Sequence, residues 1–350
     1  MLAPITHILP LTTIQRERML PLPGRVLARR GQKVNPGDVV AEAVVSPEHV
    51  LLDVSRGLDL RPEEADRYIK VQAGAQVDTG DVIAERGNVA RRVVRCPKPG
   101  KVVVAGSGQV LLELETPPFE LKAGMSGVVV ELYPDRGVLV ETTGALIQGV
   151  WGNGGIDFGL MNVLAKKPDH VLKADRLDVS LRGSVVLGGH CEDVEVIRLL
   201  DDLPLRGLIL ASMNAKLVSA ALKVRCPIIL LEGFGKLPMN PVAFKLLSTS
   251  DRREVSVNAA RWEPLLGVRP EIVIALPAEA SKQAEEITHF KPGQQVRVLR
   301  APYRGAVGGL MAVLPGVTLL PNGLMTQVAE VRFEGNEKAL IPLANLEVLG

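Results

Sequence analysis

Cysteine and aromatic side chains are scarce in this chain. Its 3 cysteines, Cys96, Cys191 and Cys226, lie far apart without Cys-x-x-Cys spacing. This pattern indicates neither a disulfide framework nor a zinc site, and it favours a reducing, cytoplasmic compartment. Aromatic residues make up 3% of the chain, so platforms for base stacking are few. Single-strand nucleic-acid binding is therefore not favoured as the main activity.

Long apolar runs and a surplus of one charge are also missing. No stretch approaches ~18 apolar residues without proline, glycine or charge, so no membrane span is expected. The N-terminus has prolines at positions 4, 10, 21 and 23 and no basic region before an apolar run, which predicts no signal peptide. A net charge of +2 does not indicate DNA coating or an acidic substrate.

The sequence repeats one twelve-residue pattern. Gly31 to Glu42 reads GQKVNPGDVVAE, and Gly74 to Glu85 reads GAQVDTGDVIAE, with seven identities and one Val/Ile exchange. Internal repeats indicate architecture. In each copy we expect the first glycine to open a turn, Gly-Asp to reverse the chain, and the Val-rich end to form a short strand. The repeat predicts small β units and no particular reaction.

The first half of the chain is expected to be almost entirely β. From residue 24 to about residue 150, short Val-rich runs alternate with Gly, Pro and Asp turns. Turn signals spaced by roughly 8–12 residues are typical of a sandwich or barrel. The exception is RPEEADRY at 61–68, where Pro62 suits a first helical position and acids follow it.

The two repeats carry further residues of a known pattern. Pro23-Gly24-x-Val26 precedes the first copy, and Pro99-Gly100-x-Val102 follows the second. In this, residues 20–118 resemble the biotinyl/lipoyl family, a resemblance that implies a barrel-sandwich hybrid fold, with residues 1–19 as an N-terminal extension. Carrier members attach their cofactor to a lysine on the hairpin after the repeat, and the matching stretches 43–49 and 86–92 have no lysine. The carrier function and a cofactor are therefore not expected; relatives also serve as non-carrier modules of large assemblies.

Residues 119–160 are expected to form a β-hairpin unit and a glycine-rich connector. The segment 124–143 predicts a hairpin with a Pro-Asp-Arg-Gly turn. Gly152, Gly154 and Gly155 then lie in a glycine-dense stretch. Such a loop can cradle a phosphate through converging N–H groups, or it can be a close-packed connector. It lacks the Lys-Ser/Thr of a P-loop.

The pattern changes to strand–helix alternation within residues 161–285. Apolar runs predict strands and intervening segments of helical spacing predict helices. The expected strands are 184–189, 206–212, 226–235, 254–259 and 271–276, and the expected helices are 190–203, 214–224 and 240–250. Continuous apolar strands alternating with helices are typical of a parallel sheet covered on both faces. Asn214 is expected to cap its helix.

Two loops of this α/β unit are candidates for a ligand site, because ligands bind such sheets at the carboxyl ends of the strands. Gly188, Gly189 and His190 follow the first strand, and Glu232 and Gly233 follow the third. His190 could be a general acid–base or a phospho-acceptor that Glu232 orients. Alternatively, these residues cap and pack.

The end of the chain carries another pattern. It reads Phe290-Lys-Pro-Gly293-Gln-Gln-Val296-Arg-Val298, then Pro302-Tyr303-Arg304-Gly305, and closes on Leu346-Glu347-Val348-Leu349. Residues 286–350 thus resemble the KOW domain, an SH3-like barrel of bacterial transcription-elongation factors of the N-utilisation-substance-G type and of some ribosomal proteins. The resemblance implies docking on RNA polymerase, ribosomal protein or RNA. The N-terminal domain by which those factors clamp polymerase has no counterpart in this sequence.

The first hairpin of this barrel holds Arg297, Arg300, Tyr303 and Arg304, a basic–aromatic cluster of the type that RNA contacts use. The stretch 309–327 is uncharged and apolar, which suits packing on the body of the protein or on a protein partner. A protein partner is the favoured expectation. Nucleic acid bound through the C-terminal barrel is the alternative.

Together these patterns predict a cytoplasmic multidomain protein, mainly β with a central α/β domain, that contains a barrel-sandwich hybrid, a parallel α/β layer and an SH3-like barrel. The expected function is a non-enzymatic scaffold or adaptor that docks on a larger assembly, in transcription or translation. The alternative is a small-ligand sensor or an enzyme, with its site where the loops 152–155, 188–191 and 232–236 meet. That alternative requires the three loops to line one pocket.

Overall fold

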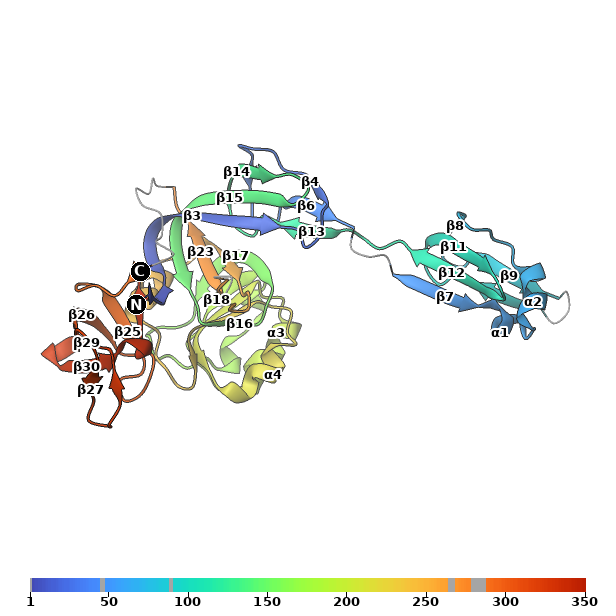
Figure 1. Ribbon diagram of the computed structural model, residues 1–350. Coiled ribbons are helices and arrows are strands. Elements are labelled where there is room, and N and C mark those ends of the chain that lie inside the picture. The colour runs from blue at the N-terminus through green and yellow to red at the C-terminus, as the bar shows by residue number, and fades with distance from the viewer. Residues whose placement is uncertain (1, 45–47, 88–90, 264–267, 278–287) are drawn as a thin grey trace.

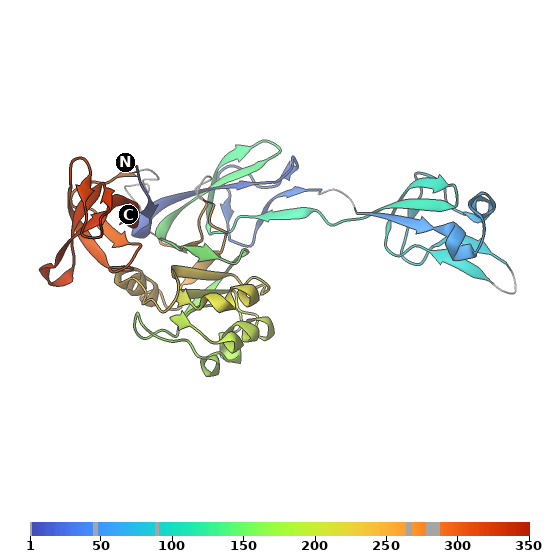
Figure 2. The ribbon, with the colours of Figure 1, turned by 60° about the horizontal axis from the view of Figure 1, so that its bottom comes forward.

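A computed structural model describes residues 2–44, 48–87, 91–263, 268–277 and 288–350. The protein is mainly β, and Figures 1 and 2 show a main body from which a small β module projects. In the described residues no helix is long and apolar enough to cross a membrane. The most extended of these helices, α3 (Val194–Asp202), has 9 residues.

A 12-stranded sheet forms the centre of the main body. Across the sheet its strands are β16 (Trp151–Gly152), β21 (Ile228–Phe234), β20 (Gly207–Met213), β18 (Ser184–Leu187), β17 (Ile156–Val163), β22 (Glu254–Asn258), β23 (Glu271–Ala275), β15 (Gly137–Gln148), β14 (Gly127–Tyr133) and β5 (Lys33–Val34). Two further strands join it: β19 (His190–Cys191) pairs with β20, and β3 (Ile8–Met19) pairs with β15. The pairs from β17 through β18 and β20 to β21 are parallel.

The predicted strands of the α/β unit form, but the last two, β22 and β23, pair antiparallel with their neighbours. β22 runs antiparallel to β17, and β23 runs antiparallel to β22. A parallel pair needs a long crossover, usually a helix, and the described residues between β22 and β23 contain none. The fourth parallel strand is instead β17, which the sequence pattern assigned partly to the glycine-rich connector.

Helices cover both faces of the parallel strands. On one face, α3 and α4 (Val218–Ala221) share an apolar cluster with buried side chains of β18, β20 and β21. On the opposite face, α5 (Pro241–Ser248) packs through Ala243 and Leu247. Asn214 Oδ1 accepts from the Lys216 N–H at 3.0 Å, so the predicted cap is confirmed. It caps a short 3-10 turn, Ala215–Leu217, ahead of α4.

The helix α3 begins four residues later than the spacing predicts. His190 and Cys191 are still strand residues, paired with Ser212 and Met213 of β20. The Asp193 carboxylate then caps the helix by accepting from the Glu195 N–H at 2.9 Å.

The expectation of a separate N-terminal extension at 1–19 is wrong, because β3 is an integral strand. It pairs with β15 from Met19↔Gly137 to Ile8↔Ile147. The register shifts between Gly144 and Leu146, opposite Pro10. Proline has no N–H to donate to a ladder and is tolerated at such a bulge. Burial of Ile8 and Ile14 fixes the inward face of the strand.

Both copies of the repeat make the same turn. Gly31 and Gly74 have φ of 81° and 91°, a region open to glycine, and each donates its N–H to a neighbouring strand at 2.7 Å. Asp38 accepts from the Asn35 N–H and Asp81 from the Asp78 N–H, each at 2.8 Å. The Gly-Asp reversal that the sequence predicts is thus formed twice.

The two copies nevertheless belong to different sheets, so residues 20–118 do not share one core. The first copy supplies β5 and β6 (Val39–Ala43) to the main body, where β6 pairs with β4 (Arg25–Val26) and β13 (Phe119–Lys122). The second supplies β8 (Gln76–Val77) and β9 (Val82–Arg86) to the projecting module. The reason is a pairing over a long sequence distance: Ala43 of β6 lies opposite Phe119 of β13.

The projecting module comprises residues 48–116. Its strands are β7 (His49–Asp53), β12 (Gln109–Leu114), β11 (Gly100–Gly106) and β8 in one sheet, and β9 and β10 (Arg92–Arg95) in a second. Three short helices complete it: α1 (Val54–Leu58), α2 (Pro62–Ala65) and a 3-10 turn, Asp66–Tyr68. The helical prediction for 61–68 is therefore confirmed.

The C-terminal sheet has the strand order β2-β31-β25-β26-β29-β30. These strands are β2 (Ile5–Thr6), β31 (Leu346–Leu349), β25 (Gln295–Val298), β26 (Val307–Val313), β29 (Val328–Arg332) and β30 (Lys338–Pro342). A small hairpin, β27 (Thr318–Leu319) and β28 (Met325–Thr326), and the pair β1 (Leu2–Ala3) and β24 (Thr288–His289) accompany it. The N-terminal residues thus also complete the C-terminal sheet.

Candidate functional site

The carboxyl ends of the parallel strands bring two predicted loops together. His190 lies opposite Ser212 of β20, and Ser212 lies opposite Gly233 of β21. The predicted loops therefore lie at the same end of the sheet, where the parallel strands have their carboxyl ends, as the general rule for such sheets predicts. They are Gly188–His190 and Glu232–Gly233. A Cβ at Gly189 would lie 1.9 Å from the His170 carbonyl oxygen, so this glycine permits close packing of the backbone.

His190 is held inside this end of the sheet. Its side chain is buried, and Nδ1 lies 2.9 Å from Ser212 Oγ. The hydroxyl of Ser212 donates to the Leu237 carbonyl at 2.7 Å and accepts from the Leu237 N–H at 3.1 Å. Burial lowers the pKa of His190, against an opposing effect of the Glu192 carboxylate. Through Ser212 the imidazole is linked to the loop at Leu237, an arrangement compatible with the packing role that was the alternative to acid–base chemistry.

The glycine-rich loop lies at the other end of the same strands. Gly152 of β16 is opposite Ile229, at the start of β21, and Gly154 donates its N–H to the Ala259 carbonyl at 2.7 Å. Gly155 follows with φ of 84°. Glu232, by contrast, is at the far end of β21. The three loops 152–155, 188–191 and 232–236 consequently do not line one pocket.

Asn153 explains why the glycine-rich loop is closed. Its Nδ2 donates to the carbonyls of Ala221, Val224 and Cys226 at 3.0, 3.3 and 3.0 Å, and its Oδ1 accepts from the Ile228 N–H at 2.7 Å. The side chain is buried. One amide thus satisfies the backbone where the chain leaves α4 and enters β21, so the stretch acts as a close-packed connector.

Replacement of Asn153 by alanine is expected to lower the free energy of unfolding by about 2 kcal/mol, because a buried N–H and three carbonyls lose their partner. Urea denaturation of the Asn153→Ala chain measures this loss. Asn35→Ala, at an exposed side chain, is the matched control and should change the free energy by less than about 0.5 kcal/mol. Equal effects of the two changes would show that the amide is not a structural tie.

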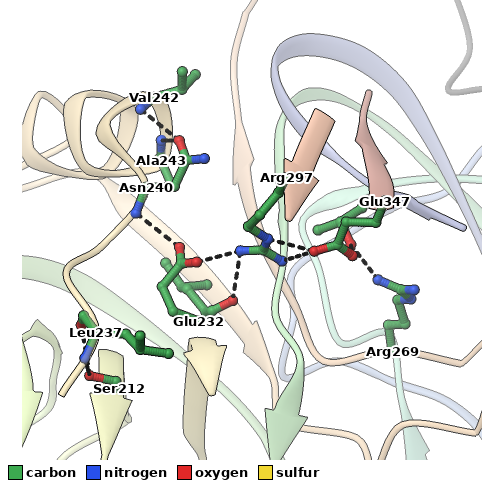
Figure 3. A network of polar contacts seen from close by, with 11 residues as sticks. Ser212, Glu232, Leu237, Asn240, Val242, Ala243, Arg269, Arg297 and Glu347 are labelled. Atoms are coloured by element: carbon green, nitrogen blue, oxygen red, sulfur yellow. Dashed lines mark hydrogen bonds and ion pairs between the residues drawn. The ribbon is translucent and has the colours of Figure 1, made fainter. Parts of the chain in front are cut away.

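Arg297 lies at the centre of a buried ion network, shown in Figure 3. Its guanidinium makes ion pairs with Glu232 of β21 and Glu347 of β31. Glu232 Oε1 also accepts from the Asn240 N–H at 2.9 Å, and Glu347 Oε2 accepts from the Thr6 hydroxyl at 2.8 Å. The network therefore joins the carboxyl edge of the parallel strands to the C-terminal sheet.

Burial of this network removes Arg297 from the surface. Its side chain is 4% exposed, so the expectation that it contacts nucleic acid is not supported by its position. Burial disfavours the charged form of Arg297 and by itself lowers its pKa. The neighbouring carboxylates of Glu232 and Glu347 outweigh this effect, so the pKa of Arg297 is raised. The arginine is a permanent cation that neutralises Glu232 and Glu347.

The other members of the predicted basic–aromatic cluster are dispersed. Tyr303 stacks on Phe333 with ring centroids 5.0 Å apart, and its hydroxyl donates to Glu337 at 3.0 Å. Arg304 donates to the Phe234 carbonyl at 3.2 Å, a second link to β21. Arg300 is exposed. Tyr303 and Arg304 thus make contacts within the protein, while Arg300 and Arg304 remain exposed.

Sequence reasoning missed Glu347, Thr6 and Arg269 as members of the network. Arg269 donates to the Thr6 hydroxyl, beside Glu347. The pattern around Arg297 carried no signal of burial, because Val296 and Val298 lie on one face of the strand and Arg297 lies on the other. Such alternation is typical of a strand with one face toward solvent.

Among the described residues, exposed apolar side chains lie side by side on paired strands at two places. The β27–β28 hairpin presents Leu319 and Met325, 66% and 64% exposed. On the module, Leu51 of β7 lies opposite Leu111 of β12, which lies opposite Val104 of β11. Leu51 and Val104 are 57% and 55% exposed. Contiguous exposed apolar side chains indicate binding surfaces.

A hollow of about 390 Å³ lies at the base of the module. Val44, Lys101, Glu113 and Thr116 are among the residues that line it. Among the described ranges, no group of three or more His, Cys, Asp or Glu residues could hold a metal ion.

No protein-family model matches the chain, and no curated protein matches it.

Proposed function

We propose that the protein is a non-enzymatic adaptor that holds two proteins at its two ends. The observation that carries this proposal is the position of the exposed apolar surfaces. The β27–β28 hairpin lies beside the C-terminal sheet at one end of the molecule, and the module that carries the apolar row lies at the other end in both ribbon views (Figures 1 and 2). A bridging protein needs separate surfaces that two partners can occupy together.

The independence of the module supports this function. Its apolar cluster is made entirely of residues within 50–114. On the body side of the connection Ala43 pairs with Phe119, and on the module side Leu114 donates its N–H to the Glu48 carbonyl. The chain therefore crosses to the module and back in two short segments, an arrangement typical of an inserted domain.

The main body, by contrast, is tied together internally. The ion pairs of Arg297 and the Arg304 bond to Phe234 connect the C-terminal sheet with β21. A binding surface on the C-terminal sheet is thus fixed to the central sheet, while the second surface is carried outward.

A protein partner suits these surfaces better than nucleic acid. The hairpin and its flanks, 309–327, contain no charged residue, whereas nucleic-acid binding draws most of its affinity from cationic contacts with phosphate. Within this proposal we retain the barrel-sandwich character of the module, the SH3-like character of the C-terminal sheet, and a role on a transcription or translation assembly in the cytoplasm.

A site-specific photo-crosslinker tests the adaptor function. It is placed at Leu319 on the hairpin or at Val104 on the module of the full-length chain, and the chain is exposed to cell extract. We expect the two positions to capture different proteins, each identified by mass spectrometry. Val179, 79% exposed on the main body, is the matched control position for nonspecific capture.

The charge variants Leu319→Asp and Val104→Asp should each reduce capture at their own end at least about tenfold and leave the other end unchanged, since a buried unpaired charge is strongly unfavourable. Identical captured proteins at all three positions would refute two-ended binding. A small molecule retained by the purified chain would favour the sensor or enzyme alternative.

A further inference from the structure

The module has an open sheet edge. β7 is the last strand in the order β7-β12-β11-β8, and in the described part of the chain it pairs with β12 alone. Leu114 donates its N–H to the Glu48 carbonyl. Because bonded and non-bonded pairs alternate in an antiparallel ladder, Val50 and Leu52 bond to β12. The main-chain groups of His49 and Leu51 therefore face away from it.

The side chains on this edge form a symmetric pattern. His49, Leu51 and Asp53 are exposed, and Val50 and Leu52 point toward the core of the module. An acid and an imidazole thus lie at equal distances on either side of a central leucine. The leucine is the outermost member of the apolar row that crosses the sheet.

We infer that β7 pairs with β7 of a second copy of this chain, antiparallel and centred on Leu51. In this register Leu51 lies opposite the partner's Leu51, and His49 lies opposite the partner's Asp53. The outward main-chain groups of the two strands match, because the same odd-numbered residues face outward in both copies. Opposite polar groups and apolar groups facing each other across strands both stabilise a pair.

The direction of β7 leaves room for the second copy. The strand starts at the base of the module and runs toward α1 at its far end (Figure 1). An antiparallel partner consequently places the two main bodies at opposite ends of the pair. The two four-stranded sheets become one continuous sheet, and the two apolar rows meet at Leu51.

Symmetry is the argument for a second copy over a foreign strand. An isologous contact requires a surface that is complementary to itself. The outward main-chain groups and the apolar centre of β7 meet that condition. His49 facing Asp53 adds to it, although Asp53 also caps α1 and His49 also lies 3.7 Å from Glu113. The contact involves five residues from each chain, so we expect a weak dimer with a dissociation constant on the order of 100 μM. This inference does not depend on the adaptor function, because association is measured without any other protein.

A cross-link between cysteines tests the register directly. Cβ atoms of directly opposite residues lie about 4.5–5.5 Å apart, farther than a disulfide prefers but within reach of a short bis-maleimide cross-linker. The three native cysteines are buried. Treatment of the full-length Leu51→Cys chain with this cross-linker should therefore give a covalent dimer. Val104→Cys is the matched control: it is equally exposed, but the two copies would lie five strand spacings apart, about 24 Å.

We expect at least tenfold more dimer with Leu51→Cys than with Val104→Cys. Sedimentation of the unmodified chain should show reversible dimers at high concentration, and Leu51→Lys should weaken them at least tenfold by placing two cations face to face. Equal cross-linking of the two cysteine variants would overturn the inference. So would no cross-linking of Leu51→Cys, which would leave the edge to an extended segment of another protein.

Discussion

Replacement of Arg297 by methionine is expected to lower the free energy of unfolding by about 4 kcal/mol, the usual cost of removing one partner from a buried ion pair. The methionine keeps most of the apolar stem but leaves Glu232 and Glu347 without a counter-charge. Both carboxylates are about as buried as the arginine. Urea or thermal denaturation of the full chain measures the loss.

The charge, not the packing, is the source of this effect, and two further variants separate them. Arg300→Met changes an exposed arginine in the same segment and should alter stability by less than about 0.5 kcal/mol. The triple variant Arg297→Met, Glu232→Gln, Glu347→Gln removes all three charges and should recover much of the loss, because neutral replacements of buried ion networks are often tolerated.

A triple variant that is no more stable than Arg297→Met would contradict this account, since it would place the cost in lost packing. A loss below about 1 kcal/mol for the single variant would contradict it as well, because a buried carboxylate without a partner costs more than that. In either case the C-terminal sheet would not be held to β21 by the network.

The network also has a consequence for binding. Glu232 was a candidate to orient a catalytic histidine, and Arg297 a candidate to touch RNA; each is instead the partner of the other. Residues committed to a buried ion pair are not available to a ligand. This is why the proposed function rests on the exposed apolar surfaces at the two ends of the molecule and not on Glu232 or Arg297.

Local features of the fold could be predicted from the sequence because they depend on neighbouring residues. The turns at Gly31 and Gly74 and the cap at Asn214 follow from the chemistry of a few adjacent residues. The separation of the two repeats could not be predicted this way. It depends on the pairing of β6 with β13 across the whole module, and no short sequence window contains both strands.

The positions of the candidate ligand loops were likewise predicted correctly in part. The rule for parallel strands correctly placed the loops at His190 and Glu232 at one edge. The hypothesis that the loop 152–155 meets them is not supported, because β16 pairs antiparallel with β21 and places Gly152 opposite Ile229, at the start of β21. Strand direction at the edge of a sheet is set by the connections of the chain, which apolar patterning does not encode.

Acid is expected to destabilise the protein through His7. This imidazole is 5% exposed, and its Nδ1 has no hydrogen-bond partner in the described residues. Burial, with the Arg16 and Arg269 guanidinium groups, lowers the pKa of His7 to about 4, against an opposing effect of the Glu271 carboxylate. In the unfolded chain a histidine has a pKa of about 6.5.

The unfolded state consequently takes up this proton first as the pH falls. The stability that His7 contributes in its neutral form is fully present above about pH 6.5, declines as the pH falls to about 4, and does not decline further below that. A difference of about 2.5 pKa units corresponds to about 3 kcal/mol between pH 7 and pH 4. His190, whose pKa burial also lowers, adds a contribution of the same sign.

His7→Gln removes the proton while keeping a polar side chain of similar size. Urea denaturation at pH 7 and pH 4 should show that this variant loses about 3 kcal/mol less than the unmodified chain over the same interval. Its stability at pH 7 can be lower without affecting the argument, because only the difference between the two pH values reports the proton. A parallel loss in both chains would show that His7 does not titrate in this interval.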